Sequence, residues 1–363
     1  MTEHNMLTAG IDIGDKYCQI SVIDGMGKAI EVVEESRIPT TQAGVKRYFE
    51  SREPMQVIIE VGTHSTWMSE KIANYGHEVL VANSRKISFI YNSDDKNDVT
   101  DAEKLARVGR MDPALLYPIT HRKESVRAAM AVVHSRDILV KSRTKLISHV
   151  RGTVKSSGER LNTCSAERFH KMVDELPEKL MGPLSEVMEV IKMLTIKIKK
   201  LDKNIEEIGK EQFPETEQMR QVTGVGPVTA LAFVLIVGDP ELFSNVRKVG
   251  NYLGLTPKQD ESGDSSQQLK ITKAGDPYVR SLLVSSAHYI MGRFGPDSDL
   301  RRCGLRIAER GGKNAKKRAA VAVARKLSVL LLSMWKSGEE YEPLRNTNKK
   351  TRTPKLVKKG EAA

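Results

Sequence analysis

Eight apolar residues between positions 184 and 208 recur at alternating spacings of three and four. The pattern lasts more than three heptads, with lysine and glutamate around it, which is typical of a coiled-coil seam. The partner expected within the chain is a helix around 126–150, so we predict an antiparallel helical hairpin or coiled coil and a dimer contact along the seam. The alternative is one amphipathic helix packed on its own domain. The seam residues are Leu184, Val187, Ile191, Leu194, Ile198, Leu201, Ile205 and Ile208.

The first 120 residues alternate between strand and helix signals. Runs of β-branched residues and period-two patterns predict five strands, and three segments between or after them are expected to be helical. Such an order predicts a mixed sheet covered by helices, an α/β or α+β layer architecture. The expected strands are 7–14, 18–24, 28–35, 55–61 and 78–83, and the expected helices are 41–51, 65–76 and the end of 91–111.

The last third is expected to be mainly helical. A helix breaks at "TGVGP" and restarts with Pro227 in its first turn. Residues 251–282 look loop-rich, and the chain is basic and helical from 299 onward. The charged end is expected to be disordered. The predicted domains are therefore 1–120, the helical hairpin 121–210, 211–340 and a basic tail 341–363.

The charge of the chain limits its partners. A formal net charge of +12 over 363 residues favours a polyanion, either nucleic acid or an acidic membrane face. Three widely spaced cysteines provide no disulfide framework and no zinc spacing, which fits a reducing compartment. No signal-peptide pattern and no apolar run long enough for a bilayer are present, so we expect a soluble cytoplasmic protein.

Four acids stand out in the first third, and we refer to them below as the four acids. Asp12 lies within the first strand, Glu60 ends a buried strand, and Asp98 and Asp101 open a helix on one face. Carboxylates from these places can converge at one sheet edge and hold Mg²⁺ beside a phosphodiester. The alternatives are local: Asp98 as an N-cap with Asp101 in a capping-box position, and Glu60 as an ordinary strand end.

The motifs "GIDIG", "IIEVGTHS" and "KNDVTDA" resemble the three acidic motifs of the DEDD insertion-sequence transposases. The resemblance implies an N-terminal ribonuclease-H-like (RuvC-like) domain, Mg²⁺ as cofactor, and the four acids as catalytic metal ligands. In that family a threonine usually precedes the first aspartate of the third motif, and Asn97 stands there in this chain.

Three further motifs, "VTGVGPVTA", "YLGLTPKQDESG" and "ITKAGDPYVR", look like the separate C-terminal domain of the same transposases. The resemblance implies that Ser262 is the nucleophile that forms a covalent phosphoserine with DNA. Read locally, "ESGDSS" is a polar turn, with Ser265 and Ser266 as rival serines. Relatives tend to carry arginine and glycine before the last motif, where this chain has "DSSQQLK", so Lys270 and Lys273 remain as candidate phosphate contacts.

Two other features favour nucleic-acid binding. Gly224 and Gly226 resemble the turn of a helix-hairpin-helix module, whose amides hold a DNA phosphate, although a helix–helix turn without ligand has the same pattern. Basic residues cluster after position 300, either as phosphate contacts or as a solvated face. They are Arg301, Arg302, Arg306, Arg310, Lys313, Lys316, Lys317, Arg318, Arg325 and Lys326.

The combined features predict a DNA transposase or recombinase of a mobile element. The resemblance further implies a structured non-coding guide RNA and a tetramer built from dimers, with sequence reading delegated to base pairing. A junction-resolving nuclease that uses water as its nucleophile is an alternative, and so is an actin-like ATPase or sugar kinase. The third alternative is a non-catalytic protein scaffold that binds RNA or DNA.

Overall fold

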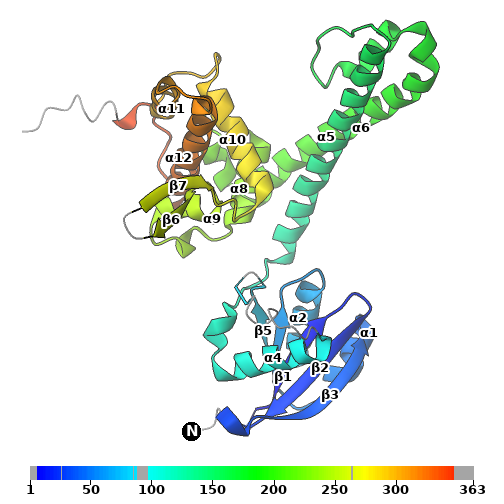
Figure 1. Cartoon of the computed structure of the whole chain (residues 1–363), viewed down its shortest axis with the longest axis vertical. Helices are drawn as coiled ribbons and strands as arrows, with labels where there is room; N and C mark the ends of the chain where they lie inside the picture. Colours follow the sequence, from blue (N-terminus) through cyan, green and yellow to red (C-terminus); the bar gives the residue numbers. More distant parts are fainter. Residues whose placement is uncertain (1–5, 26, 85, 88–96, 263–264, 347–363) are drawn as a thin grey trace, which may run out of the picture. The chain divides into compact units, whose positions relative to one another are not determined.

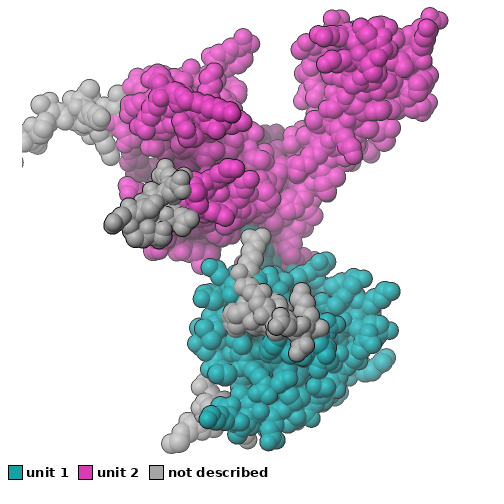
Figure 2. Space-filling model, viewed as in Figure 1, with its two compact units in different colours: residues 1–122 teal, residues 123–363 magenta. Residues whose placement is uncertain are grey.

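The computed structural model describes residues 6–25, 27–84, 86–87, 97–262 and 265–346. It divides into two compact units, 1–122 and 123–363 (Figure 2). The helical hairpin and the C-terminal helices thus fall in one unit. The finer division of that unit at position 210 stays a prediction, and residues 347–363 of the predicted tail lie outside the described residues.

The first unit is built on a mixed five-stranded sheet in the order β3-β2-β1-β4-β5 (Figure 1). β1 pairs antiparallel with β2 and parallel with β4, and β4 pairs parallel with β5. The predicted succession of strands and helices is confirmed, although the third strand begins and ends later than expected. The strands are β1 (Thr8–Ile13), β2 (Tyr17–Asp24), β3 (Glu31–Pro39), β4 (Gln56–Glu60) and β5 (Glu78–Ala82).

Helices of the first unit cover the two faces of this sheet. The helices α1 (Gln42–Phe49) and α2 (Ser65–Asn74) share one apolar core with alternate residues of β1, β2 and β4. The helix α4 (Asp98–Met111) packs against β1 and β2 on the opposite face, and Ile58 of β4 shares a core with Leu105 there. A 3-10 turn (Pro113–Leu116) follows α4.

Two glycines let α4 lie close to the sheet. A Cβ on Gly10 would fall 2.0 Å from the carbonyl oxygen of Ala102, and one on Gly109 would fall 2.5 Å from Cγ1 of Ile58. Real Cβ contacts are never this short, so any larger residue would push helix and strand apart. The first glycine of "GIDIG" therefore sets the distance between β1 and α4.

The second unit begins with two long helices that pack against each other (Figure 1). They are α5 (Glu124–Ser156) and α6 (Glu178–Gln212), and a 3-10 segment (Phe169–Glu175) lies between them in sequence. Every second residue of the predicted seam is buried, namely Leu184, Ile191, Ile198 and Ile205, and the other four are half-buried. The predicted helical hairpin is therefore present, whereas supercoiling and dimerisation along the seam stay predictions.

A buried arginine lies within this helix pair. Arg143 of α5 is 7% exposed, and its Nη1 donates a hydrogen bond of 3.3 Å to Oγ1 of Thr195 on α6. Thr195 in turn donates to the carbonyl of Ile191 one turn earlier. The hairpin thus contains a buried polar contact among apolar layers, and Nε of Arg136 on α5 also donates to Oδ1 of Asp202 on α6 at 2.5 Å. Such polar contacts favour a single register of the two helices.

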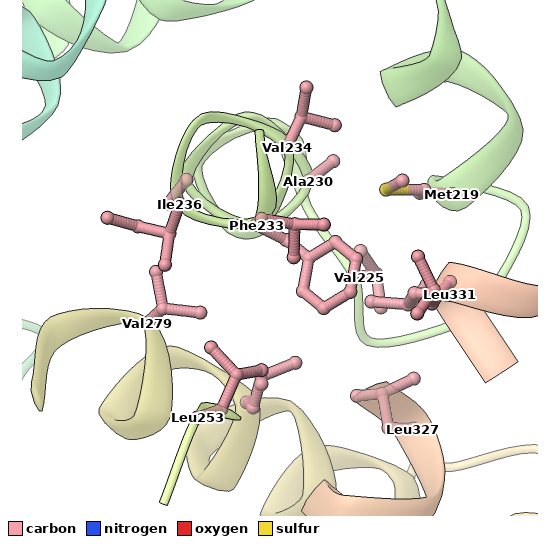
Figure 3. Packing of buried hydrophobic residues seen from close by; sticks show 14 of the residues in the cluster. Met219, Val225, Ala230, Phe233, Val234, Ile236, Leu253, Val279, Leu327 and Leu331 are labelled. Carbon is pink, nitrogen blue, oxygen red and sulfur yellow. The ribbon is translucent and has the colours of Figure 1, made fainter. Parts of the chain in front are cut away.

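The helix α8 (Pro227–Val237) is buried along most of its length, and the hairpin helices α5 and α6 as well as later helices pack against it. Its residues Ala230 and Phe233 belong to one large core with Leu253, Val279 and Leu327 (Figure 3). No helix of the described chain is long and apolar enough to cross a membrane. The helices are α7 (Glu215–Met219), α8 (Pro227–Val237), α9 (Val249–Tyr252), α10 (Pro277–Met291), α11 (Asp299–Glu309) and α12 (Ala315–Ser337), with 3-10 turns at Pro240–Leu242 and Val246–Lys248.

A β-hairpin interrupts these helices, within a stretch that was expected to be rich in loops. The strands β6 (Pro257–Ser262) and β7 (Ser265–Ile271) pair antiparallel. The sequence predicted only that residues 251–282 are rich in loops, and no strand was expected among them. The two strands are joined by backbone pairing from Pro257 with Ile271 to Ser262 with Ser265.

Candidate active site

The four acids lie on one side of the first unit's sheet. Successive side chains of a strand point to opposite faces, so Asp12 points to the same face as Gly10, which touches α4. By the same rule Glu60 shares the α4 face with Ile58. Ile11 pairs with Ile59 in the parallel ladder, so Asp12 and Glu60 follow as neighbours at the carboxyl ends of β1 and β4. Asp98 and Asp101 occupy the first turn of α4, which covers this face.

The first turn of α4 is capped by Asn97. Its side-chain oxygen accepts a hydrogen bond of 3.2 Å from the amide of Val99. The alternative in which Asp98 is the N-cap was therefore wrong. Asp98 is the first helical residue and is exposed, while Asp101 in the same turn is buried. Among the described residues, the cap of this helix is the side chain of Asn97 and neither of these carboxylates.

Negative charge accumulates around Asp12. Burial is the main cause that raises the pKa of its carboxyl from 3.8 to about 6. The negative charges of the other three acids, Asp98, Asp101 and Glu60, raise it further. Residues separated by up to 89 positions in sequence thus interact electrostatically in the fold, in the combination that the sequence predicted.

Asp101 supplies the test of whether a cation fits here. Its Oδ1 is buried and has no hydrogen-bond partner among the described residues, although Nζ of Lys104 lies 3.7 Å away. An oxygen-only set of four carboxylates is the chemistry that hard divalent cations prefer. The described side chains include no group of three arranged closely enough to hold an ion as they stand, so binding requires these carboxylates to turn toward one another.

Two residues beside the four acids escaped the sequence analysis. Oδ1 of Asp15, in the loop after β1, lies 3.6 Å from Nε2 of His64, in the loop after β4. Nδ1 of His64 accepts a hydrogen bond from Nε1 of Trp67, which fixes the ring and leaves Nε2 facing Asp15. Only the pairing of β1 with β4 brings these loops together, so no local pattern could reveal the contact.

The proposed nucleophile, Ser262, is the last residue of β6 and pairs with Ser265 across the hairpin end. Its side chain lies outside what the structure describes. The base of the hairpin is tightly built: a Cβ on Gly275 would fall 2.1 Å from the carbonyl of Tyr252. Lys273 there has a φ of 55°, an uncommon conformation for a lysine, and its amide donates to Gly254 O at 3.1 Å.

The glycines of "TGVGP" form the turn that leads into α8. Gly224 has a φ of 96°, and Gly226 is the N-cap residue, followed by Pro227 in the first turn. The restart of the helix at Pro227 is thereby confirmed. Whether this turn acts as a helix-hairpin-helix contact stays a prediction.

The basic residues predicted to contact DNA differ in whether their side chains already bond to other parts of the protein. Nη1 of Arg301 donates to the carbonyls of Ile290 and Gly292, so its guanidinium ties α11 to the end of α10. Arg302 pairs with Asp297 through two hydrogen bonds, and Arg318 donates to Gly311 O at 3.1 Å. The lysines of the prediction, Lys270, Lys273, Lys316 and Lys317, are exposed.

The sheet order, together with acids at the ends of β1 and β4 and at the start of α4, defines a RuvC-like domain of the DEDD type. Comparison with known families agrees: residues 9–158 match the transposase family of the DEDD IS110 type, and residues 216–301 match the transposase IS116/IS110/IS902 family. Together these ranges span well over half of the chain. The chain belongs to the IS110/IS116 family of DEDD transposases, which are transposases of insertion sequence elements.

Individual relatives resemble the chain over nearly its whole length. A probable family 20 transposase of Pseudomonas aeruginosa is 24% identical over 93% of this chain and 99% of its own. The transposase for insertion sequence element IS1111A of Coxiella burnetii is 26% identical, over 92% of this chain and 90% of its own. The transposase for IS1328 of Yersinia enterocolitica is 26% identical over 80% of this chain and 85% of its own.

Proposed function

We propose that this transposase cuts and rejoins DNA with a divalent-metal site formed by the four acids and with Ser262 as a covalent nucleophile. The observation that carries the proposal is that the ends of β1 and β4 and the first turn of α4 bring the four acids to one face of the sheet, where three of them help to raise the pKa of Asp12. Such mutual repulsion disfavours the fully charged cluster unless a cation neutralises it. DEDD domains typically use a divalent metal ion, and we propose Mg²⁺.

In this proposal the four acids share one role, which is to hold the cation. Asp12, Glu60, Asp98 and Asp101 hold the cation, and Asn97 fixes the first turn of α4 so that two of them stay at the sheet edge. The bound ion supplies Lewis-acid polarisation of a phosphodiester oxygen. Gly10 keeps α4 close enough to β1 for the acids of both elements to act on one group.

Ser262 is proposed to form and later break a bond to phosphorus. Its Oγ bonds to the phosphorus of a DNA strand as the bond to the deoxyribose oxygen breaks, and the serine proton ends on that leaving oxygen. The hydroxyl of another strand then displaces Ser262, which recovers its proton. The covalent link keeps the phosphodiester energy for rejoining, which suits transposition better than hydrolysis.

We also propose that the protein acts with a structured non-coding RNA on donor and target duplexes, as a dimer or tetramer. Aromatic residues make up only 5% of the chain, which limits stacking on unpaired bases, whereas exposed lysines such as Lys316 and Lys317 suit backbone phosphates. A protein of this kind reads backbone and shape while base pairing reads sequence.

The test is a denaturing gel of the full-length protein incubated with labelled element-end DNA, the RNA transcribed beside the gene, and Mg²⁺. We expect a protein–DNA adduct that is lost in Ser262→Ala and kept in Ser265→Ala. Asp12→Asn is expected to lose cleavage as well as adduct. Cleavage with no adduct in either serine variant would instead establish a nuclease that uses water.

A further inference from the structure

A row of side chains on the first unit's sheet leads from the four acids to an arginine. Asp12 of β1 pairs with Gln19 of β2, and Gln19 pairs with Arg37 of β3. Residues paired in this way point to the same face of a sheet, so the row crosses three strands on the face that carries the four acids. Because neighbouring strands lie about 4.8 Å apart, the backbone of Arg37 is about 10 Å from that of Asp12.

Tyr17 belongs to the same surface. It comes two residues before Gln19 on β2 and therefore shares its face. The guanidinium carbon of Arg37 lies 4.2 Å from the centroid of the Tyr17 ring, which is a cation–π contact. Both side chains are exposed, although α4 covers the adjoining part of this face over β1 and β2. We refer to these two residues below as the Tyr17–Arg37 pair.

The contact with the tyrosine leaves the polar edge of the guanidinium available. Among the described residues, Arg37 has no hydrogen bond and no ion pair, and its N–H groups lie in the guanidinium plane rather than along the direction of a ring contact. Two other arginines of this unit are committed within the fold: Arg52 pairs with Glu34, and Arg107 pairs with Glu103. An arginine that is held by a ring, faces solvent and keeps its donors suits an external anion.

We propose that the Tyr17–Arg37 pair binds the DNA strand beside the four acids, with Arg37 on a phosphate close to the one that is cut and Tyr17 against the adjoining deoxyribose. This inference rests on the proposed function, which places the cut phosphate at the four acids. Their negative charge repels the neighbouring phosphates, so the strand needs a positive contact close by. A guanidinium binds phosphate through two parallel hydrogen bonds, and the contact positions DNA without reading its sequence.

The charge of Arg37 is tested by the salt dependence of DNA binding. Fluorescence anisotropy measures the affinity of the full chain for labelled element-end DNA at several salt concentrations, with chelator present so that no strand is cut. Loss of one phosphate contact lowers the slope of log affinity against log salt by about 0.7–0.9. We expect this change in Arg37→Gln, together with an affinity that is about 3- to 10-fold weaker, whereas Arg37→Lys should keep the parent slope.

The matched control is Arg47→Gln. Arg47 is also exposed, but it lies on α1, which covers the opposite face of the sheet. Its substitution removes the same charge from the same unit and should change neither the slope nor the affinity by more than twofold. Equal losses in Arg37→Gln and Arg47→Gln would reflect net charge alone and would overturn the proposal.

The ring of Tyr17 is tested separately from the charge. Tyr17→Thr removes the ring but keeps a residue that favours strands, so circular dichroism should stay unchanged. We expect weaker DNA binding with an unchanged salt slope, because no charge is lost, and Tyr17→Phe should bind within twofold of the parent. Parent-like binding in Tyr17→Thr would overturn the role of the ring.

Two further outcomes separate this proposal from the proposed function. A parent-like slope in Arg37→Gln would overturn the pair as a DNA contact, even where Asp12→Asn abolishes cleavage and so upholds the acid site. A lower slope in Arg37→Gln with cleavage retained in Asp12→Asn would uphold the contact and overturn the acid site instead. A change of slope with duplex RNA but not with duplex DNA would overturn the assignment to DNA.

Discussion

Gly10 of β1 touches the backbone of Ala102 in α4, so closely that a Cβ on Gly10 would fall 2.0 Å from the Ala102 carbonyl oxygen. Asp12 lies two residues after this contact and Asp101 directly precedes Ala102. The distance between strand and helix therefore also sets the distance between two of the four acids.

Gly10→Ala is expected to separate β1 from α4, because backbone atoms cannot yield as a flexible side chain can. Overpacking of this kind costs about 1–3 kcal/mol of unfolding free energy. Strand transfer should fall by more than the folded fraction does, since the acids of the two elements move apart. Denaturant unfolding and a strand-transfer assay measure the two effects, and Gly152→Ala, where a Cβ meets nothing, is the control. Parent-like activity in Gly10→Ala would contradict the proposed cooperation of the acids.

Asp12→Asn is expected to stabilise the metal-free protein near pH 7. The folded pKa of Asp12, about 6, exceeds its usual 3.8, so folded protein binds the proton more tightly and stability falls as pH rises from about 4 to 6. Asparagine cannot ionise and so avoids this loss of stability. Because solvent screens the charge, the expected gain in unfolding free energy is about 1 kcal/mol. In thermal melts with chelator, the melting temperature of Asp12→Asn should equal that of the parent at pH 4 and exceed it at pH 7. Glu78→Gln on the exposed edge of β5 should shift neither melt.

Divalent-cation binding should depend on the same proton. Ligand carboxylates must be deprotonated, so Mg²⁺ or Mn²⁺ should bind more tightly at pH 7 than at pH 5 and should release protons near pH 6. Titration calorimetry in two buffers of different ionisation enthalpy measures both the affinity for the cation and the number of protons released. Asp101→Asn is expected to weaken binding at least tenfold, whereas Glu103→Gln, whose carboxylate pairs with Arg107 on the same helix, should not. Equal affinity at both pH values would count against the site.

The pairing of Glu34 on β3 with Arg52 predicts that the stability of the fold falls in acid. Arg52 donates to both oxygens of Glu34, and this pairing is the main cause that holds the pKa of Glu34 at about 2. Its stabilisation is present above pH 4.5 and is lost as pH falls toward 2. Glu34→Gln should therefore lower the unfolding free energy at pH 7 by about 1–2 kcal/mol and make the acid transition less steep. Glu35→Gln, at the neighbouring exposed position, is the control for urea titrations.

The helix pair offers a test with two positions on the same helix. Ile198 is 3% exposed and Ile196 is 59% exposed. Ile198→Lys places a charge between α5 and α6 and should lower the unfolding free energy by about 3 kcal/mol or more. Ile196→Lys should change it by no more than about 0.5 kcal/mol. Circular dichroism melts measure this, and light scattering shows whether the mass changes. Loss of oligomers in Ile196→Lys alone would place a subunit contact on the exposed face instead of the seam.

The sequence predicted the strands of the first unit and the set of four acids because both depend on local patterns: β-branched runs, and carboxylates at strand ends. It did not predict the role of Gly10, since a missing side chain shows no partner until α4 is in place. The hairpin β6–β7 was missed because its residues favour turns. Arg301 looked like a phosphate contact, yet its guanidinium bonds the end of α10, a contact between segments that no charge pattern encodes. Ser262 could be selected only by resemblance.

The cap on α4 explains why asparagine can replace the threonine usual at position 97. Both residues offer a side-chain oxygen to the same amide, so position 97 can drift among asparagine, threonine, serine and aspartate at little cost. Asp98 has no part in this cap, so under the proposed metal site its carboxylate is kept for the cation and has no such freedom. Adjacent codons in this mobile element should thus evolve at unequal rates, with interchange at 97 and purifying selection at Asp98.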